Sequence, residues 1–128
     1  VLTAKENVEF SMHLQGRPKK ERDARAKELL EAVGLGDRMD SRPSKMSGGQ
    51  QQRVAVARAL ASKPKFVLAD EPTANLDSKS TETLLDIMEK LNKEEGMTFI
   101  FSTHDARVVK KARRVITVED GQVKSDEN

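Results

Sequence analysis

The sequence predicts an α/β fold in which a helical region precedes a parallel sheet with crossover helices. Apolar residues first recur at helical spacing, most clearly over residues 26–33. After Pro64 they form short uninterrupted runs at 66–69 and 98–101, which are typical of strands covered on both faces. These runs alternate with helical segments, and such an alternation favours parallel strands joined by crossover helices.

The helical region is predicted from periodicity and from its stop signals. The amphipathic helix over 26–33 ends at Gly34, where a left-handed glycine fits. Polar and turn-forming residues at 37–45 indicate a loop. Ser47 then resembles an N-cap for a helix over 50–62. Because that helix is apolar on most sides, we expect it to be buried on most sides.

The second region contains the predicted strands. Residues 78–95 have apolar positions at helical spacing, and Gly96 follows them as a stop. A short helix is expected over 105–112 and a third strand of the same sheet over 115–118. Asp120-Gly121 then predicts a hairpin turn. We therefore expect a boundary near Lys63, with a helical subdomain at 1–62 and an α/β part at 63–128.

Composition limits the classes of protein to which the chain can belong. The 128 residues suit one domain or part of one, and their formal net charge is +2. With no cysteine in the chain, a disulfide scaffold and a Cys-based zinc site are excluded. Basic clusters at 17–20 and 110–114 are interpreted as solvated helix faces. Since the charge is nearly balanced and aromatic residues are few, no nucleic-acid partner is expected.

Titratable side chains follow two neighbouring strands of the predicted sheet. Asp70 and Glu71 end the first strand, and His104 follows the second. Parallel strands joined by one crossover finish at the same edge, so we expect the three side chains to gather there. Adjacent carboxylates point to opposite sides, which allows one to help hold a metal while the other orients a water. The alternatives are a polar strand exit and a structural histidine.

A glycine pair opens the predicted helix that follows the loop. Ser47-Gly48-Gly49-Gln50 exposes backbone N–H groups at a helix N-terminus, which is a favourable place for an anion such as phosphate. Ser47 can add a hydroxyl and Gln50 an amide. The alternative is a glycine turn that only caps the helix.

Four segments together resemble the motifs of ABC-type ATPases. MSGGQQQR at 46–53 is similar to the signature motif, and FVLADEPT at 66–73 is similar to Walker B. NLD at 75–77 resembles the D-loop and STHD at 102–105 the H-loop. The resemblance extends over residues 2–123 and is strongest to the branch of lipoprotein-releasing and macrolide-efflux exporters. It implies part of a P-loop NTPase core, preceded by an ABC-type helical subdomain.

The resemblance implies a role for each strand-end residue. Asp70 would help hold Mg²⁺ through water, and Glu71 would be the general base that orients the attacking water. His104 would contact the γ-phosphate of ATP. This division of roles suits phosphoryl transfer, which depends mainly on positioning and charge stabilisation.

The resemblance also implies a dimer with shared nucleotide sites. Ser47, Gly48, Gly49 and Gln50 would contact the γ-phosphate of ATP bound to the opposite subunit, and Asp77 would communicate across the interface. A second nucleotide-binding subunit and an integral membrane permease are the implied partners. The implied location is the cytoplasmic face of the inner or plasma membrane.

The phosphate-binding loop of the family is not found in these 128 residues. No Gly-x4-Gly-Lys-[Ser/Thr] occurs, and the chain starts at Val1 without Met. We therefore expect the C-terminal part of an ATPase domain, inactive by itself. Three alternatives stay open: a DNA-repair or chromosome-maintenance ATPase, a translation factor, and a non-hydrolysing fragment. The glutamines after Gly49 and the Pro72-Thr73 pair favour a transporter over the first, and Gln50 with Ala74-Asn75 favours it over the second.

Overall fold

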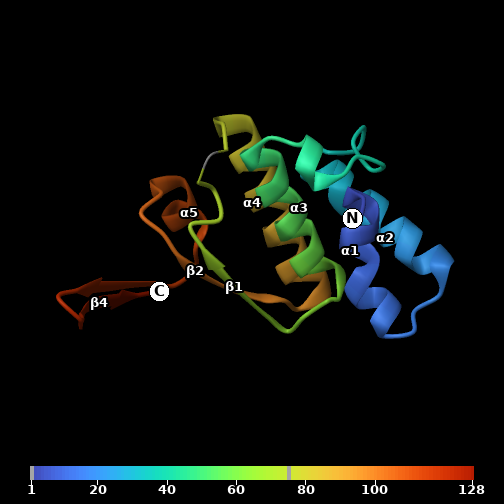
Figure 1. Ribbon diagram of the computed structural model, residues 1–128. Coiled ribbons are helices and arrows are strands. Elements are labelled where there is room, and N and C mark those ends of the chain that lie inside the picture. Colours follow the sequence, from blue (N-terminus) through green and yellow to red (C-terminus); the bar gives the residue numbers. More distant parts are fainter. Residues whose placement is uncertain (1, 75) are drawn as a thin grey trace.

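The computed structural model describes residues 2–74 and 76–128, so that Asn75 of the predicted D-loop and Val1 lie outside the described residues. Figure 1 shows helices α1 to α4 grouped together, with a two-stranded hairpin at the opposite end of the molecule. None of the described helices is long and apolar enough to cross a membrane. The elements are α1 (Ala4–Leu14), α2 (Lys19–Ala32), the 3-10 helix η1 (Pro43–Lys45), α3 (Gly48–Ala61), β1 (Phe66–Asp70), α4 (Ser78–Glu95), β2 (Thr98–Ser102), α5 (Ala106–Lys111), β3 (Val115–Glu119) and β4 (Gln122–Glu127).

The core lies between the helices, where their apolar stripes meet. Met12 of α1, Leu30 of α2 and Leu60 of α3 are each 0% exposed, and Leu84 and Met88 bring α4 against them. Each stripe recurs at helical spacing, so one face of every helix is apolar and is buried against its neighbours. Helix α2 ends as the sequence predicts, before Gly34 with its left-handed φ of 79°.

Helix α3 differs from the prediction in its burial. It begins after the Ser47 cap as expected, but only one face is buried, formed by Val54, Ala57, Leu60 and Ala61. Ala55 and Ala59 are exposed. Alanine is the best helix former and is common on exposed helix faces, so an alanine-rich helix need not be buried all round. The prediction of burial on most sides is therefore wrong.

Strands β1 and β2 pair in parallel, from Phe66 opposite Thr98 to Asp70 opposite Ser102. Val67, Phe99 and Phe101 face the helices and pack against the core. The other face is open, because Leu68 is 78% exposed and Ile100 is 53% exposed. The expectation that both strands are covered on both faces is wrong for the described residues, since the sheet packs against the helical core on one face alone.

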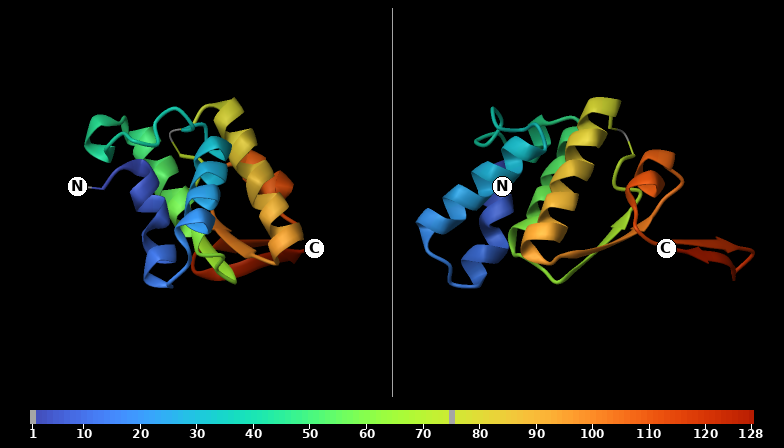
Figure 2. Two further views of the ribbon diagram at one scale, coloured as in Figure 1. Left: turned by 90° about the vertical axis from the view of Figure 1, so that its right-hand side faces the viewer. Right: turned by 180° about the vertical axis from the view of Figure 1, so that it is seen from behind.

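The third predicted strand exists, but it does not join the parallel sheet. β3 pairs with β4 in antiparallel fashion, across the predicted turn at Asp120-Gly121, where both φ angles are positive. Figure 2 shows this hairpin projecting beyond the rest of the molecule. A groove of about 640 Å³ lies between β2, α5 and the start of β3, with Phe101, Val108 and Ile116 in its lining. The hairpin turn is thus confirmed, whereas the expectation that β3 belongs to the same sheet as β1 and β2 is wrong for the described residues.

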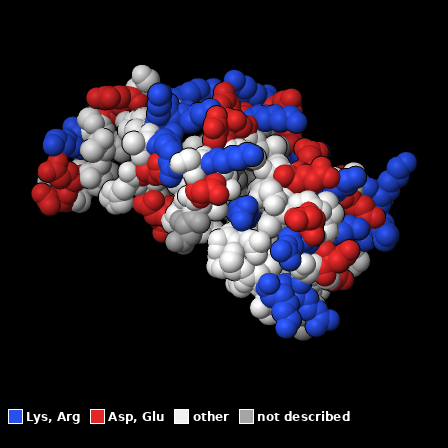
Figure 3. All heavy atoms as spheres, turned by 90° about the horizontal axis from the view of Figure 1, so that it is seen from above, with Lys and Arg blue, Asp and Glu red and all other residues white. Residues whose placement is uncertain are grey.

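Charges of both signs alternate on the surface. On the face seen in Figure 3, Lys and Arg side chains are interspersed with Asp and Glu. Both predicted basic clusters contain ion pairs, but only part of each lies on a helix, because Arg17 precedes α2 and Arg113 and Arg114 follow α5. Arg17 lies 3.4 Å from Glu21, and the Lys111 ammonium lies 3.0 Å from an Asp86 oxygen.

Candidate functional site

The site forms where β1 and β2 end side by side. Their register places Asp70 opposite Ser102, and the backbone N–H of Glu71 then donates to the Ser102 carbonyl at 2.8 Å. This pairing carries Glu71 to the same sheet edge as Thr103 and His104. The structure therefore brings together the residues that the sequence placed after each strand, because a parallel pair without a register shift ends at one edge.

The Glu71 carboxylate is held by two hydrogen bonds, one to each oxygen. The Thr103 hydroxyl donates to Glu71 Oε2 at 3.1 Å, and the backbone N–H of His104 donates to Oε1 at 3.1 Å. The φ of Glu71 is 47°, a left-handed value that non-glycine residues rarely adopt. Such strain persists only where the surroundings fix the backbone, and it is concentrated at functional sites.

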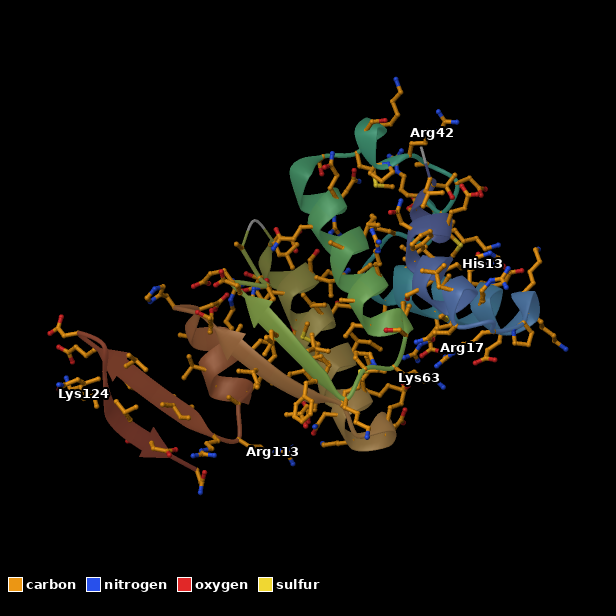
Figure 4. The ribbon with its side chains drawn as sticks, turned by 60° about the horizontal axis from the view of Figure 1, so that its bottom comes forward. His13, Arg17, Arg42, Lys63, Arg113 and Lys124 are labelled. Atoms are coloured by element: carbon orange, nitrogen blue, oxygen red, sulfur yellow. The ribbon has the colours of Figure 1, made fainter. Side chains whose placement is uncertain are left out.

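Asp70 and His104 differ from Glu71 in their surroundings. Asp70 is exposed, on the open face of the sheet that also carries Leu68, whereas Glu71 is half-buried. His104 is exposed, and its contact with Glu71 runs through its backbone N–H rather than through its imidazole. Asp70 is thus accessible to a solvated ion, and the imidazole is accessible to a ligand. His13 lies on α1, far from this edge, as Figure 4 shows.

A hydrogen-bond network that the sequence did not reveal supports the edge. The Thr73 hydroxyl, in a side chain only 3% exposed, donates to Asp105 Oδ2 at 2.7 Å. The Arg107 guanidinium donates to both oxygens of Asp105, at 3.0 and 2.8 Å. These hydrogen bonds hold the pKa of the Asp105 carboxyl well below its usual range, and the bond from Arg107 has a larger effect than the bond from Thr73. The signal in the sequence was the place of Thr73 in the 66–73 motif and of Asp105 in the 102–105 motif, whereas Arg107 lies outside both motifs.

The glycine turn forms both the cap and an open surface. Gln50 donates its backbone N–H to Ser47 Oγ at 3.1 Å, and Ser47 donates its own to Gln50 Oε1 at 3.0 Å. The two side chains therefore form a capping box. The first N–H groups of a helix have no carbonyl acceptor within the helix. A Cβ added at Gly48 would meet nothing within 4 Å, so this end of α3 is open to a ligand.

Three consecutive side chains fix the start of α3. Gln51 donates to the Pro43 carbonyl at 2.9 Å, and Arg53 donates to the Val33 carbonyl at 3.0 Å. Gln52 approaches the carbonyls of Glu71 and Pro72, each at 3.4 Å. The glycine turn is therefore connected to the preceding loop, to the end of α2 and to the backbone of Glu71.

Asp77 has a capping role in the structure. It is the N-cap of α4 and accepts the backbone N–H of Ser80 at 2.7 Å. This hydrogen bond lowers the pKa of the Asp77 carboxyl below its ordinary value. The side chain is exposed, so it remains accessible to a neighbouring molecule.

The implied metal can be tested against the residues present. No group of three or more His, Asp and Glu side chains close enough to hold a metal occurs among residues 2–74 and 76–128. Mg²⁺ usually keeps several waters and takes only one or two carboxylates together with substrate phosphates. The exposed Asp70 carboxylate fits that mode of binding.

The parallel strand pair with its carboxylates and the glycine-opened helix carry the segments that resemble the motifs of the ABC family. The chain belongs to the ABC transporter family, whose sequence pattern matches residues 1–74. It is 53% identical to an uncharacterised ABC transporter ATP-binding protein of Thermotoga maritima, over 98% of this chain and 53% of that protein. It is 50% identical to a macrolide export ATP-binding/permease protein of Paracoccus denitrificans, over 98% of this chain and 19% of that protein.

A solved structure agrees with the fold. The dimeric structure of the ATP-binding cassette MJ0796, bound to ADP and Pi, matches with a TM-score of 0.88 and 43% identity. The match covers 99% of this chain and 56% of that chain. The predicted fold class and the resemblance to the macrolide-efflux branch are thus confirmed. The chain spans about half the length of the Thermotoga relative, of which it covers 53%, and of the solved chain, of which it covers 56%.

Proposed function

We propose that this chain provides the signature motif and the catalytic carboxylates of a transporter ATPase that binds and hydrolyses ATP between two head-to-tail subunits. The observation that carries the proposal is the Glu71 carboxylate, held by Thr103 and His104 beside the exposed Asp70. The dimeric cassette with ADP and Pi, similar in fold, supports both the substrate and the second subunit.

Each strand-end residue has one role in the proposed reaction. Glu71 orients the attacking water and accepts its proton, since each carboxylate oxygen keeps a free acceptor position beyond its bond to Thr103 or His104. Asp70 holds Mg²⁺ through water, and the ion would neutralise charge on the phosphates. The exposed imidazole of His104 contacts the γ-phosphate.

The glycine turn acts on the nucleotide of the opposite subunit. Ser47, Gly48, Gly49 and Gln50 present the N-terminus of α3 to that γ-phosphate, where backbone N–H groups and the helix dipole favour negative charge. The open space around Gly48 supports such an approach. Asp77, exposed at the start of α4, communicates between the two sites.

The proposed assembly includes a membrane partner. The similar Paracoccus protein is named as an ATP-binding/permease protein, and this chain would serve an integral permease from the cytoplasmic face of the membrane. Residues 1–62 form the helical subdomain and residues 63–128 belong to the α/β core. Because these 128 residues contain no Gly-x4-Gly-Lys-[Ser/Thr], we expect them to bind ATP poorly and not to hydrolyse it alone.

Substitution of each carboxylate in the complete ATPase tests the proposal. Glu71→Gln keeps the size of the side chain but removes the base, so the hydrolysis rate should fall by about 10²–10⁴-fold. ATP and Mg²⁺ should still bind, and the unhydrolysed nucleotide should accumulate an ATP-dependent dimer on size exclusion. Asp70→Asn should instead weaken binding of Mg²⁺-ATP and yield no trapped dimer.

The two variants control for each other. A trapped dimer from Asp70→Asn together with lost nucleotide affinity in Glu71→Gln would mean that the two roles are exchanged. Hydrolysis at the parental rate in both variants would remove the pair from catalysis, and would leave a polar strand exit in a non-hydrolysing protein.

A further inference from the structure

We propose that Thr103 is a positioning residue that fixes the Glu71 carboxylate for hydrolysis, an inference that rests on the proposed function. The Thr103 hydroxyl accepts the backbone N–H of Asp105 at 2.9 Å and lies 3.1 Å from Glu71 Oε2. A hydroxyl has a single hydrogen, and a carboxylate oxygen can only accept. With its acceptor side occupied by Asp105, the hydroxyl directs its hydrogen to Glu71.

Thr103 can perform this role because its own partner is fixed. Asp105 caps the start of α5 by accepting the backbone N–H of Arg107 at 2.9 Å. The guanidinium of Arg107 and the hydroxyl of Thr73 complete its hydrogen bonds. Thr73 is 3% exposed and cannot move without disturbing its surroundings. The network therefore runs from the exit of β1, through the start of α5, back to the Glu71 carboxylate.

The Glu71 carboxylate needs two points of attachment. The last side-chain torsion of glutamate has a broad energy profile, so one hydrogen bond leaves the carboxylate plane free to rotate. The His104 N–H holds Oε1 and the Thr103 hydroxyl holds Oε2. Together they fix the plane and thereby the direction of the remaining lone pairs that would meet a water. Such orientation contributes to the rate, because a small misplacement of a reacting group is costly.

The test compares Thr103→Val, which removes the hydroxyl at nearly constant shape, with Thr103→Ser, which keeps it. Both are made in the complete ATPase, and steady-state ATP hydrolysis is measured. We expect kcat of the valine variant to fall about 10- to 100-fold, the range for loss of a hydrogen bond to a charged group. KM for ATP should change by less than about twofold, because the hydroxyl orients Glu71 and does not bind the nucleotide. The serine variant should recover most of kcat.

Thr83→Val on α4 is the matched control. Its hydroxyl donates to the Lys79 carbonyl at 3.0 Å on an exposed helix face, so kcat should remain at the parental value. If the valine variant of Thr103 fails to fold, Thr103→Ala compared with Thr103→Ser answers the same question.

Three outcomes would overturn the inference. The first is a parental kcat in Thr103→Val. The second is an equal loss of kcat in the valine and serine variants. The third is a loss of kcat/KM that comes entirely from a higher KM. Glu71→Gln in the same assay separates this failure from that of the proposed function. If Glu71→Gln hydrolyses ATP at the parental rate, the proposed function fails; if it is inactive while Thr103→Val is not, only the role of Thr103 fails.

Discussion

The helices and the strands of this molecule differ in how far their apolar residues are buried. In α1 and α2 the apolar residues that face the other helices are buried, with Met12 and Leu30 both 0% exposed, although Leu14 at the end of α1 is 71% exposed. In β1 the apolar run is divided, because Val67 packs on the core while Leu68 is 78% exposed. The same kind of residue is thus core where another element faces it and surface where none does. Burial depends on whether the covering surface is present, which local sequence does not specify.

The candidate site lies where the two regions meet. The glycine turn belongs to the helical region and Glu71 to the strand region, and Gln52 connects them through the carbonyls of Glu71 and Pro72. At the other end of α3, Arg25 of α2 donates to Glu95 Oε2 at 2.8 Å and to the Leu60 carbonyl at 3.1 Å. Each end of α3 is therefore connected by polar contacts to the β1–α4–β2 unit.

The largest expected effect tests the contrast in burial directly. In the 128-residue chain, Leu30→Ala should lower the free energy of unfolding by about 2–5 kcal/mol, because it leaves a cavity in the core. Leu68→Ala should change it by less than about 0.5 kcal/mol, since the side chain is exposed. Urea unfolding of the two variants measures both values. A large loss from Leu68→Ala would show that a further surface covers this face in solution.

The second prediction concerns the contact between the regions at Arg25, which is 8% exposed. Arg25→Met keeps the apolar stem but removes the hydrogen bonds to Glu95 and Leu60. We expect a loss of about 1.5–3 kcal/mol in the free energy of unfolding, the range for hydrogen bonds to charged groups.

Lys93→Met is the matched control for Arg25→Met. Lys93 pairs with Glu89 at 2.8 Å on an exposed helix face, and such pairs contribute only about 0.3–0.5 kcal/mol. If both variants lose the same small amount, the buried contact contributes no more than a surface pair, and the two regions are joined by apolar packing alone.

Local signals in the sequence predicted the elements well. Gly34 and Gly96 end α2 and α4 in left-handed conformations, and Ser47 caps α3. Each of these depends on the chemistry of one or two neighbouring residues, which sequence displays directly. The position of His104 beside Glu71 was also predictable, because a single crossover brings two parallel strands to one edge.

The failures concern contacts between residues distant in sequence. The hairpin turn after β3 was predicted, but β3 was wrongly assigned to the parallel sheet, and apolar runs could not show which face of β1 would be open. Thr73, Thr103 and Asp105 were visible only as members of motifs. Their joint action depends on distances of 2.7–3.1 Å that exist only after folding.

The last and smallest predicted effect lies inside the helical region, at the Glu9 carboxyl group of α1, which has charged neighbours on α1 and α2. Glu9 Oε1 is buried and has no hydrogen-bond partner among the described residues. Burial is the main cause that raises the pKa of Glu9 from 4.5 to about 7, and the neighbouring Asp23 is the second cause. The Lys5 ammonium lies 3.0 Å from Asp23, and Lys5 and Arg22 limit the rise by favouring the ionised form of Glu9.

The raised pKa of Glu9 makes the stability of the chain depend on pH. The folded state holds the Glu9 proton more tightly than the unfolded state, so this contribution to stability is complete below pH 4.5 and is lost as the pH rises through about 7. Glu9→Gln stays neutral throughout and should be more stable than the parent by about 1 kcal/mol at pH 8, less than the full pKa shift corresponds to because solvent screens this part-exposed group, with no such gain at pH 4. Urea unfolding at both pH values, with the exposed Glu28→Gln correcting for the loss of one carboxylate, measures the difference. An equal effect of Glu9→Gln at both pH values would show that Glu9 is solvated, and that the packing of α1 against α2 is looser than the apolar core beside it.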